Sequence, residues 1–257
     1  EKINGRFCLA VFDTKTNILC LGRDRFGLST LFYTCFDGLI AFSSRAKGLL
    51  GLPGVSNELD HSFLKAAAAT NYRFLDTNNS LSPFRNIKQV PPGTIVRFDD
   101  KKMQTEQFAS LTIDEIRRSN KPTREEYIHL FNKAVSKRLK VAKKPIFSLS
   151  GGLDSSSVVS MAQQITQKKQ TAISSVHPNK LYDEQEEILD VIQAGKANWN
   201  SVTITNPNIF EKLTKIYSSH DYPLPTVTWL NHLLLAEEAA KLGYTDLFTG
   251  LGGDELH

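Results

Sequence analysis

The sequence predicts an α/β protein whose second part is a doubly wound parallel sheet with helices between its strands. Three observations support this. Short apolar runs split by turns lie between Arg6 and Phe42, extended and helical patterns alternate from residue 123 onward, and a glycine-rich turn follows each of two later strands. Such alternation is typical of parallel sheets, which bind ligands at the carboxyl ends of their strands. The strand-to-helix junctions are therefore the expected places for a site.

The first part favours antiparallel strands. Two pairs of apolar runs, each pair separated by a short polar loop, predict β-hairpins at 6–22 and 31–42. An alanine-rich stretch predicts a helix at 60–69, and a Pro-Pro-Gly turn at 91–93 leads into a strand at 94–98. These elements predict an antiparallel sheet ahead of the parallel one.

The second part begins with a helix, because Thr123-Arg-Glu-Glu126 is a capping-box pattern. One buried face of this helix is predicted by the helical spacing of Tyr127, Leu130, Phe131, Ala134, Val135 and Leu139. Strands are then expected at 145–149, 171–176, 202–205 and 246–249, and helices at 155–168, 183–197, 208–218 and 230–242. We expect one domain over 1–110, a linker over 111–122 and a second domain over 123–257.

Composition excludes several classes of protein. The net charge of the 257 residues is +4 without a run of five like charges, which argues against a nucleic-acid partner. No apolar stretch approaches the roughly 20 residues of a membrane span, so we expect no membrane partner and a cytoplasmic location. Cys8, Cys20 and Cys35 form no Cys-x-x-Cys pair, which predicts buried, reduced thiols. The chain starts inside a turn without Met and stops soon after a Gly-Gly turn, so we expect a piece of a longer protein.

A phosphate loop is predicted at Ser150-Gly-Gly-Leu-Asp-Ser-Ser156, where a strand turns into a helix. Two glycines without Cβ let the backbone approach a ligand, and the N–H groups at a helix N-terminus attract an anion. Ser150, Ser155 and Ser156 add hydroxyl donors. No lysine follows the glycines, so the loop is not of the Walker type. We expect a bulky residue at Gly151 to abolish ATP binding while leaving the fold intact.

A second glycine-rich turn, Thr249-Gly-Leu-Gly-Gly-Asp-Glu255, follows the last expected strand. If both turns lie at the carboxyl edge of one sheet, Asp154 and Asp254 come close to the same phosphates. Carboxylates are ligands that Mg²⁺ accepts, and a divalent cation stabilises a departing pyrophosphate. The sequence therefore predicts Asp154 and Asp254 as metal-holding, catalytic aspartates.

The first loop resembles the signature of the ATP pyrophosphatase (PP-loop) superfamily, whose members split ATP between its α and β phosphates. The order of the motifs narrows this further. Asn4-Gly-Arg-Phe7, Gly22-Arg-Asp-Arg-Phe-Gly27 and Val90-Pro-Pro-Gly93 precede the first loop, and Tyr182-Asp183-Glu184 stands between the two loops. This arrangement resembles the glutamine-dependent asparagine synthetase family over nearly the whole chain.

The resemblance implies part of an N-terminal-nucleophile (Ntn) class II glutaminase domain, a sandwich of two antiparallel sheets, joined to an adenine nucleotide alpha hydrolase-like synthetase domain. It also implies the family's reaction, in which ATP adenylates a carboxylate substrate, pyrophosphate leaves with Mg²⁺, and ammonia, from glutamine or free, or an amine attacks the acyl-adenylate. The resemblance leaves open whether the protein forms a homodimer. The family's ATP contacts match Leu149, Ser150, Gly151, Gly152, Leu153, Asp154, Ser155, Ser156, Val176, Thr249 and Gly250, and Asp183, Glu184 and Leu251 match positions near the substrate.

The chain departs from the family at Leu251, where asparagine synthetases have a glutamate and β-lactam synthetases a tyrosine. Leucine cannot accept a proton, so any base must come from elsewhere. The family's glutaminase nucleophile is an N-terminal cysteine that none of the three cysteines replaces. Two alternatives to an asparagine synthetase-like ligase stay open. One is a lasso-peptide or β-lactam type cyclase with an inactive glutaminase scaffold, and the other is a non-catalytic nucleotide-binding module.

Overall fold

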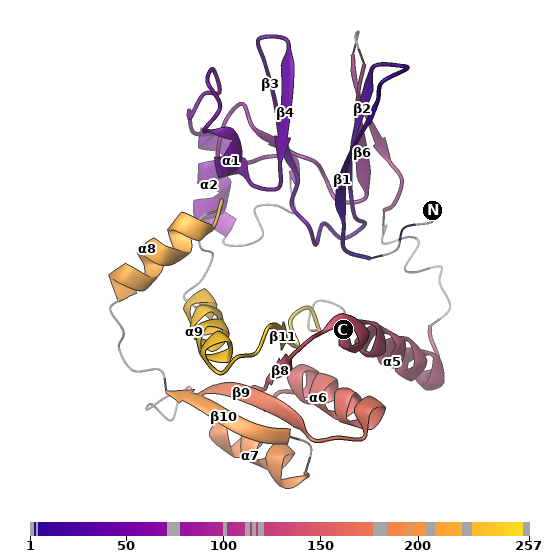
Figure 1. Ribbon diagram of the computed structural model, residues 1–257, viewed down its shortest axis with the longest axis vertical. Coiled ribbons are helices and arrows are strands. Elements are labelled where there is room, and N and C mark those ends of the chain that lie inside the picture. Colours follow the sequence, from indigo (N-terminus) through magenta and orange to yellow (C-terminus); the bar gives the residue numbers. More distant parts are fainter. Residues whose placement is uncertain are drawn as a thin grey trace. The chain divides into compact units, whose positions relative to one another are not determined.

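The computed structural model describes residues 3, 5–70, 78–99, 102–110, 114, 117, 121–176, 184–195, 197–203, 209–222 and 228–253 (Figure 1). The chain forms two compact units. Unit 1 comprises Glu1–Ser119 and Tyr217–Thr226, and unit 2 comprises Asn120–Ile216 and Val227–His257. Most of the expected linker over 111–122 lies outside the described residues.

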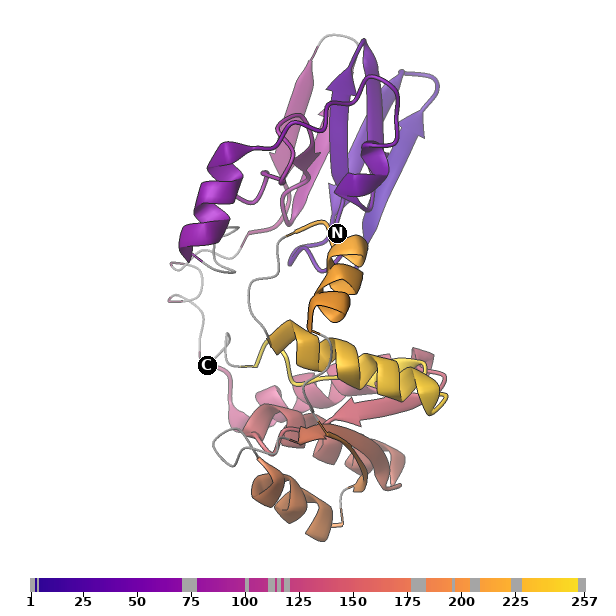
Figure 2. The same ribbon diagram turned by 90° about the vertical axis from the view of Figure 1, so that its left-hand side faces the viewer.

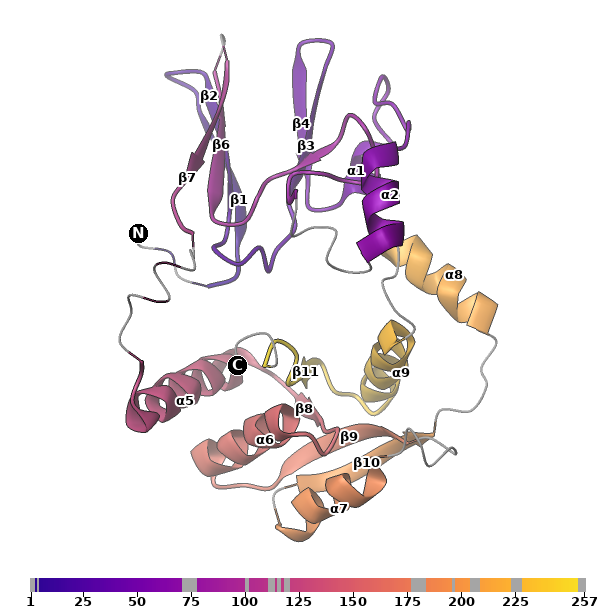
Figure 3. The ribbon, with the colours of Figure 1, turned by 180° about the vertical axis from the view of Figure 1, so that it is seen from behind.

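Unit 1 contains two antiparallel sheets, and Figure 3 shows the strands of the larger sheet side by side. Its order is β1-β2-β6-β7, with bounds Cys8–Asp13, Ile18–Arg23, Thr94–Phe98 and Met103–Gln107. The smaller sheet has the order β4-β3-β5, with bounds Leu39–Ser43, Phe32–Phe36 and Lys88–Gln89. Helices α1 and α2 span Ala46–Leu49 and His61–Thr70. The antiparallel pairs β1–β2 and β3–β4 confirm both predicted hairpins.

Two small clusters of buried side chains hold unit 1 together. One gathers around Leu21 and Val96 from neighbouring strands of the larger sheet. The other gathers around Phe32, Leu49 and Ile87, under helix α1. Strands β5 and β7 were not predicted. Strand β7 has five exposed residues and no apolar alternation that could reveal it, and β5 is only two residues long.

Unit 2 is a parallel sheet of four strands in the order β10-β9-β8-β11. The strands are β8 (Pro145–Ser148), β9 (Gln170–Val176), β10 (Ala197–Thr203) and β11 (Asp246–Phe248). The helices are α5 (Arg124–Val141), α6 (Leu153–Thr166), α7 (Gln185–Gln193), α8 (Ile209–Ser219) and α9 (Thr228–Lys241). The predicted capping box is present at the start of α5, where Glu126 N–H donates to Thr123 Oγ1 and Thr123 N–H donates to Glu126 Oε2.

Helices cover both faces of this sheet, which confirms a mixed α/β unit with a parallel sheet. Figure 2 shows α7 and α9 on opposite sides of it. Val135, Val159 and Ile188 from α5, α6 and α7 share one core cluster. On the other face, Leu235 and Ala239 of α9 pack with side chains of β8 and β9. A doubly wound arrangement of this kind leaves the strand ends available for a site.

Three expectations were wrong in detail. The helix expected over 183–197 ends at Gln193, because Gly195 turns the chain with φ +73° and Ala197 already belongs to β10. Tyr127 and Leu130 of α5 are exposed, since this helix buries only the face around Val135. The thiols of Cys8 and Cys35 are exposed rather than buried, and all three cysteines are free. Cys8 begins the edge strand β1, which has a neighbour on one side only.

Among the described residues, no helix is long and apolar enough to cross a membrane.

Candidate nucleotide site

The sheet topology brings the two glycine-rich turns together. Strands β8 and β11 are neighbours, with Phe147 opposite Phe248, so the turns that follow them leave the sheet side by side. Strand β9 lies on the other side of β8. The chain that leaves β8 leads to β9 on one side of it, whereas β11 lies on its other side. The strand order therefore reverses between β8 and β11, which makes the edge where their turns lie a topological switch point. In open α/β sheets this is where ligands bind.

The two turns touch, and a side chain at Gly250 would clash with the backbone of the first turn. A Cβ added at Gly250 would lie 2.6 Å from the backbone nitrogen of Ser155, in the first turn of α6. A Cβ added at Gly253 would lie 2.0 Å from Asp154 Oδ2. Real Cβ atoms do not approach that closely. At Gly250 the clash is with backbone, which cannot yield without moving the helix start, whereas at Gly253 the Asp154 side chain would have to move away. The second turn thus packs directly against the carboxylate of Asp154.

Hydrogen bonds from Ser155 hold the first turn in place. The buried Ser155 Oγ accepts from the backbone N–H of Ser150 at 3.1 Å and donates to the carbonyl oxygen of Gly152 at 3.2 Å. The Ser150 hydroxyl lies 3.0 Å from Ser155 Oγ. Gly152 is the N-cap of α6, and no side chain caps this helix end. Uncapped N–H groups and the helix dipole together favour an anion at this position.

The three serines of the turn differ in accessibility. Ser150 is exposed, whereas Ser155 is 6% exposed and already engaged in the turn. The Ser156 hydroxyl is buried and has no hydrogen-bond partner within the described part of the chain. A buried hydroxyl without a partner is costly. The structure therefore gives Ser155 a role in shaping the turn, and it leaves Ser150 as the serine that faces solvent.

Gly151 also has a structural role that was not expected. Its φ is +80°, and an added Cβ would lie 2.5 Å from Glu187 Cβ and 3.0 Å from Ile188 N. Both belong to helix α7, so Gly151 allows α7 to pack on the turn. The expectation that a bulky residue at Gly151 would leave the fold intact is wrong for this reason. Sequence spacing carries no signal for a contact between segments so far apart.

The other residues predicted for the site differ in exposure and in their place on the strands and turns. Leu149 is buried, and its N–H donates to the carbonyl oxygen of Ile173 at 3.0 Å. Leu153 and Leu251 are 79% and 71% exposed. Val176 ends β9, Thr249 and Gly250 follow β11 and are half-buried, and Glu184 is the exposed N-cap residue of α7. Asp183 and Asp254 lie outside the described residues.

The chemistry of the turn suits a divalent cation. Asp154 offers a carboxylate beside a glycine turn, and Mg²⁺ commonly takes one or two carboxylates together with phosphate oxygens and waters. Within the described ranges, no three His, Cys, Asp or Glu side chains gather into a metal cluster. The residues present therefore fit a cation shared with a phosphate ligand.

In unit 1, one network joins the three upstream motifs. The guanidinium of Arg23, 5% exposed, donates to the carbonyl oxygens of Ser29, Val90 and Gly27 at 2.6, 2.8 and 2.7 Å. The carboxylate of Asp24, 1% exposed, accepts from the backbone N–H groups of Phe7, Phe26, Leu28 and Ser29 at 3.0–3.3 Å. Motifs far apart in the sequence thus meet at Arg23 and Asp24.

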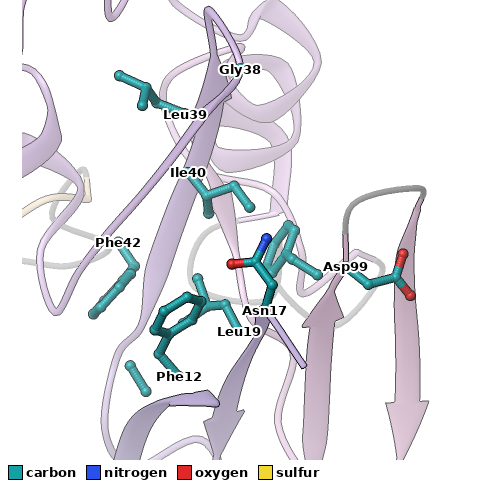
Figure 4. A pocket seen from close by; sticks show the side chains of 10 residues that line it. Phe12, Asn17, Leu19, Gly38, Leu39, Ile40, Phe42 and Asp99 are labelled. Carbon is teal, nitrogen blue, oxygen red and sulfur yellow. The ribbon is translucent and has the colours of Figure 1, made fainter. Parts of the chain in front are cut away.

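Unit 1 also has a pocket of about 710 Å³ (Figure 4). Figure 4 shows apolar side chains of both sheets around it, including Phe12, Leu19, Ile40 and Phe42. Its polar side chains come from Asn17 and Asp99. None of the residues predicted for nucleotide binding lines this pocket, so it is separate from the site of unit 2.

Comparison with known proteins supports the division into two kinds of domain. A family model described as a glutamine amidotransferase domain matches residues 1–109, and one described as asparagine synthase matches residues 126–257. A glutamine-hydrolyzing asparagine synthetase of Bacillus subtilis is 29% identical over 63% of this chain and 26% of its own length. A putative asparagine synthetase of Methanocaldococcus jannaschii is 24% identical over all of this chain and 50% of its own length. Amidase chyE of Penicillium rubens is 25% identical over 98% of this chain and 39% of its own length.

This chain spans half or less of the length of these relatives. The asparagine synthase model nevertheless covers just over half of the chain, in the part that carries both glycine-rich turns, and the amidotransferase model covers the part that carries the Arg23–Asp24 network. The chain belongs to the glutamine-dependent asparagine synthetase family.

Proposed function

We propose that this chain is part of an ATP-dependent amide-forming ligase that adenylates a substrate carboxylate. The observation that carries the proposal is the contact of the two glycine-rich turns at the switch point, with Asp154 against Gly253. We assign residues 1–110 to a class II, Ntn-type glutaminase part and residues 123–257 to the synthetase part, with 111–122 between them.

The proposed reaction has two steps. A carboxylate oxygen of the substrate attacks the α-phosphorus of ATP, the bond to the β-phosphate oxygen breaks, and pyrophosphate leaves. A nitrogen nucleophile then attacks the acyl carbon, AMP leaves with the electrons of the C–O bond, and the nitrogen gives up a proton. The uncapped N–H groups at the start of α6 suit the negative charge of the phosphates. Mg²⁺, when held by Asp154 and Asp254, supplies charge neutralisation at the departing pyrophosphate.

Membership of the family supports expectations about the nitrogen source and about the residues near the substrate. We expect ammonia, free or released from glutamine, because the first part matches a glutamine amidotransferase domain. Asp183 and Glu184 are the residues that we expect near the carboxylate substrate. Leu251 is 71% exposed and cannot accept the proton that the second step releases, so the base comes from another residue.

Because Leu251 cannot act as a base, two other functions also stay open. An amide-forming cyclase would use an amine of its own substrate in place of ammonia, with the glutaminase part as a scaffold. A non-catalytic nucleotide-binding module would hold ATP without reaction. A cysteine directly after the initiator Met of the full-length protein would favour the glutamine-dependent ligase over the cyclase, because that cysteine is the glutaminase nucleophile.

The test is ATP–pyrophosphate exchange by the full-length protein with a panel of carboxylic acids and Mg²⁺. We expect exchange that depends on one acid. We also expect Asp154→Asn to reduce it by about 100-fold or more, because the variant loses a charge at the phosphates. Asp190→Asn, on the exposed side of α7, is the matched control and should exchange like the wild type. ATP binding without exchange for any acid would overturn the ligase and favour the nucleotide-binding module.

A further inference from the structure

A short segment that begins within the last turn of α8 and ends before α9 belongs to unit 1, although the sequence on both sides of it belongs to unit 2. This segment is Tyr217–Thr226. Helix α8 ends at Ser219 and α9 begins at Thr228, so the segment is tied at both ends to helices of the parallel-sheet part. Within the segment, Tyr217, Asp221 and Tyr222 contact residues of unit 1.

The ring of Tyr222 lies among aromatic side chains of the unit 1 core. Its centroid is 5.7 Å from that of Phe63, with the rings stacked, and 6.0 Å from that of Phe32. Phe32 and Phe63 are 0% and 1% exposed. Aromatic pairs at such distances add to the stabilisation from burial alone. The half-buried ring is therefore packed against the core of unit 1.

The hydroxyl of Tyr222 ends a buried polar network. The amide nitrogen of Gln89, a residue that is 3% exposed, donates to Tyr222 Oη, and its Oε1 accepts from Arg23 Nη2 at 2.9 Å. Arg23 in turn holds the carbonyl oxygens described above. Burial also raises the pKa of the Tyr222 phenol, which keeps it neutral. Tyr222 is thus linked to the two loops that Arg23 organises.

Asp221 fixes the segment at the start of helix α1. Its Oδ1 accepts from the backbone N–H of Lys47 at 3.1 Å, and its Oδ2 lies 3.6 Å from Arg45 Nε. The Asp221 side chain is only 10% exposed. The ammonium of Lys47 donates to the carbonyl oxygen of Tyr217. Asp221 and Tyr222 therefore attach the segment to the rest of unit 1, Asp221 through its carboxylate and Tyr222 through its aromatic ring. We call these two residues the anchor.

The other end of the connection leads to the nucleotide site. Leu235 and Ala239 of α9 pack with Ile146 of β8 and Ile173 of β9. Strand β8 runs directly into the first glycine-rich turn, and the Leu149 N–H at its end donates to Ile173. Glu237 of α9 pairs with Lys212 of α8 at 2.7 Å, and α8 runs to Ser219, just before Asp221. Packed elements, an ion pair and the chain itself thus lead from the first turn through β8, α9 and α8 to the anchor. Coupling between distant sites needs such a contiguous set of elements, and it must be shown by measurement.

We propose that Asp221 and Tyr222 are positioning residues that couple the two units, so that ATP binding at the turns of unit 2 slows local opening of unit 1 around the anchor. The proposal rests on the proposed function only in requiring that unit 2 binds ATP. Binding energy that rigidifies α9 and the paired helix α8 also restricts the end of α8 that runs into the anchor, and the effect is reciprocal.

The test is amide hydrogen exchange of the intact chain, measured by NMR with and without saturating Mg²⁺ and ATP. Two amides report on unit 1: Lys47, which donates to Asp221, and Gln89, which donates to the Ser80 carbonyl oxygen at 2.8 Å. The Leu149 amide reports on the nucleotide site itself. In the wild type we expect ATP to slow all three, the unit 1 amides by about fivefold or more.

The variants Tyr222→Phe and Asp221→Ala should lose the ATP effect at the Gln89 amide while keeping it at Leu149. Tyr222→Phe removes only the hydroxyl, so it keeps the test valid if Asp221→Ala does not fold. Tyr217→Phe is the matched control, since its side chain is 47% exposed in the same segment, and it should behave like the wild type.

Three results would overturn the proposal. If ATP slows exchange at Leu149 but not at Lys47 or Gln89 of the wild type, the units are uncoupled while the ATP site stands. If both anchor variants keep the effect at Gln89, the coupling does not run through Asp221 and Tyr222. If ATP changes none of the three amides, the nucleotide site of the proposed function fails as well.

Discussion

Replacing Gly250 by alanine is expected to destabilise unit 2 by about 1–3 kcal/mol and to weaken ATP binding together with it. The new Cβ would lie 2.6 Å from Ser155 N and 2.9 Å from the carbonyl carbon of Asp154. Both atoms are backbone in the first turn of α6, so relief requires the helix start to move. That movement separates the two turns that form the proposed site. Urea unfolding and an ATP titration of the same variant measure the two effects.

Gly152→Ala is the control for stability, because an alanine there adds only an ordinary contact. Its Cβ would lie 3.4 Å from Ser150 Oγ, and the backbone of Gly152, at φ −66° and ψ 161°, is open to any residue. Its free energy of unfolding should stay within about 0.5 kcal/mol of the wild type. A Gly250→Ala protein as stable as Gly152→Ala would show that the turns do not touch as described.

Replacing Asp24 by alanine is expected to destabilise unit 1 by about 3 kcal/mol or more. The carboxylate is 1% exposed, and its loss leaves four backbone N–H groups without their acceptor. Unfolding by urea, followed by circular dichroism, measures the change. Asp13→Ala is the matched control. Asp13 accepts from Lys15 N and Thr16 Oγ1 on an exposed loop, and water can replace it. Equal losses in the two variants would contradict the role given to Asp24.

The same carboxylate predicts how stability depends on pH. Burial raises the pKa of Asp24, but the hydrogen bonds from Ser29, Leu28, Phe7 and Phe26 together outweigh it, so the pKa is lowered. The carboxylate therefore stabilises the fold fully above the unfolded pKa of about 3.9, and this stabilisation is lost as the pH falls through the lower, folded value. Urea midpoints measured from pH 7 down to pH 3 should fall more steeply for the wild type than for Asp24→Ala.

Local patterns in the sequence were enough to predict much of the fold. Thr123 and Glu126 form the predicted capping box, since both partners lie within one helical turn. The hairpins were predictable because each pairs runs separated by a few residues. The meeting of the two glycine-rich turns could also be anticipated, because parallel strands place their carboxyl ends at one edge of the sheet.

Contacts between distant segments could not be predicted in this way. Glycine at position 151 is required by the backbone of α7, more than 30 residues further along the chain. Tyr222 carries no motif, and its role depends on Gln89 and Arg23, which precede it by more than 100 residues. Only the end of β10 was predicted as a strand, at 202–205, because its start at Ala197 depends on pairing with β9 and carries a weak local pattern. In each case, tertiary contacts decide the role of the residue.

The most direct test of the central claim is a calorimetric titration of the wild type and of Gly152→Ala with ATP in the presence of Mg²⁺. The Gly152 position faces no neighbour that a methyl group would disturb, so a change in affinity reports on the ligand and not on the fold. We predict that the wild type binds ATP and that Gly152→Ala binds it at least about tenfold more weakly, because in the proposed site the methyl group would take the space of a phosphate oxygen at the start of α6. Equal affinities in the two proteins would contradict the assignment of this turn as the phosphate site.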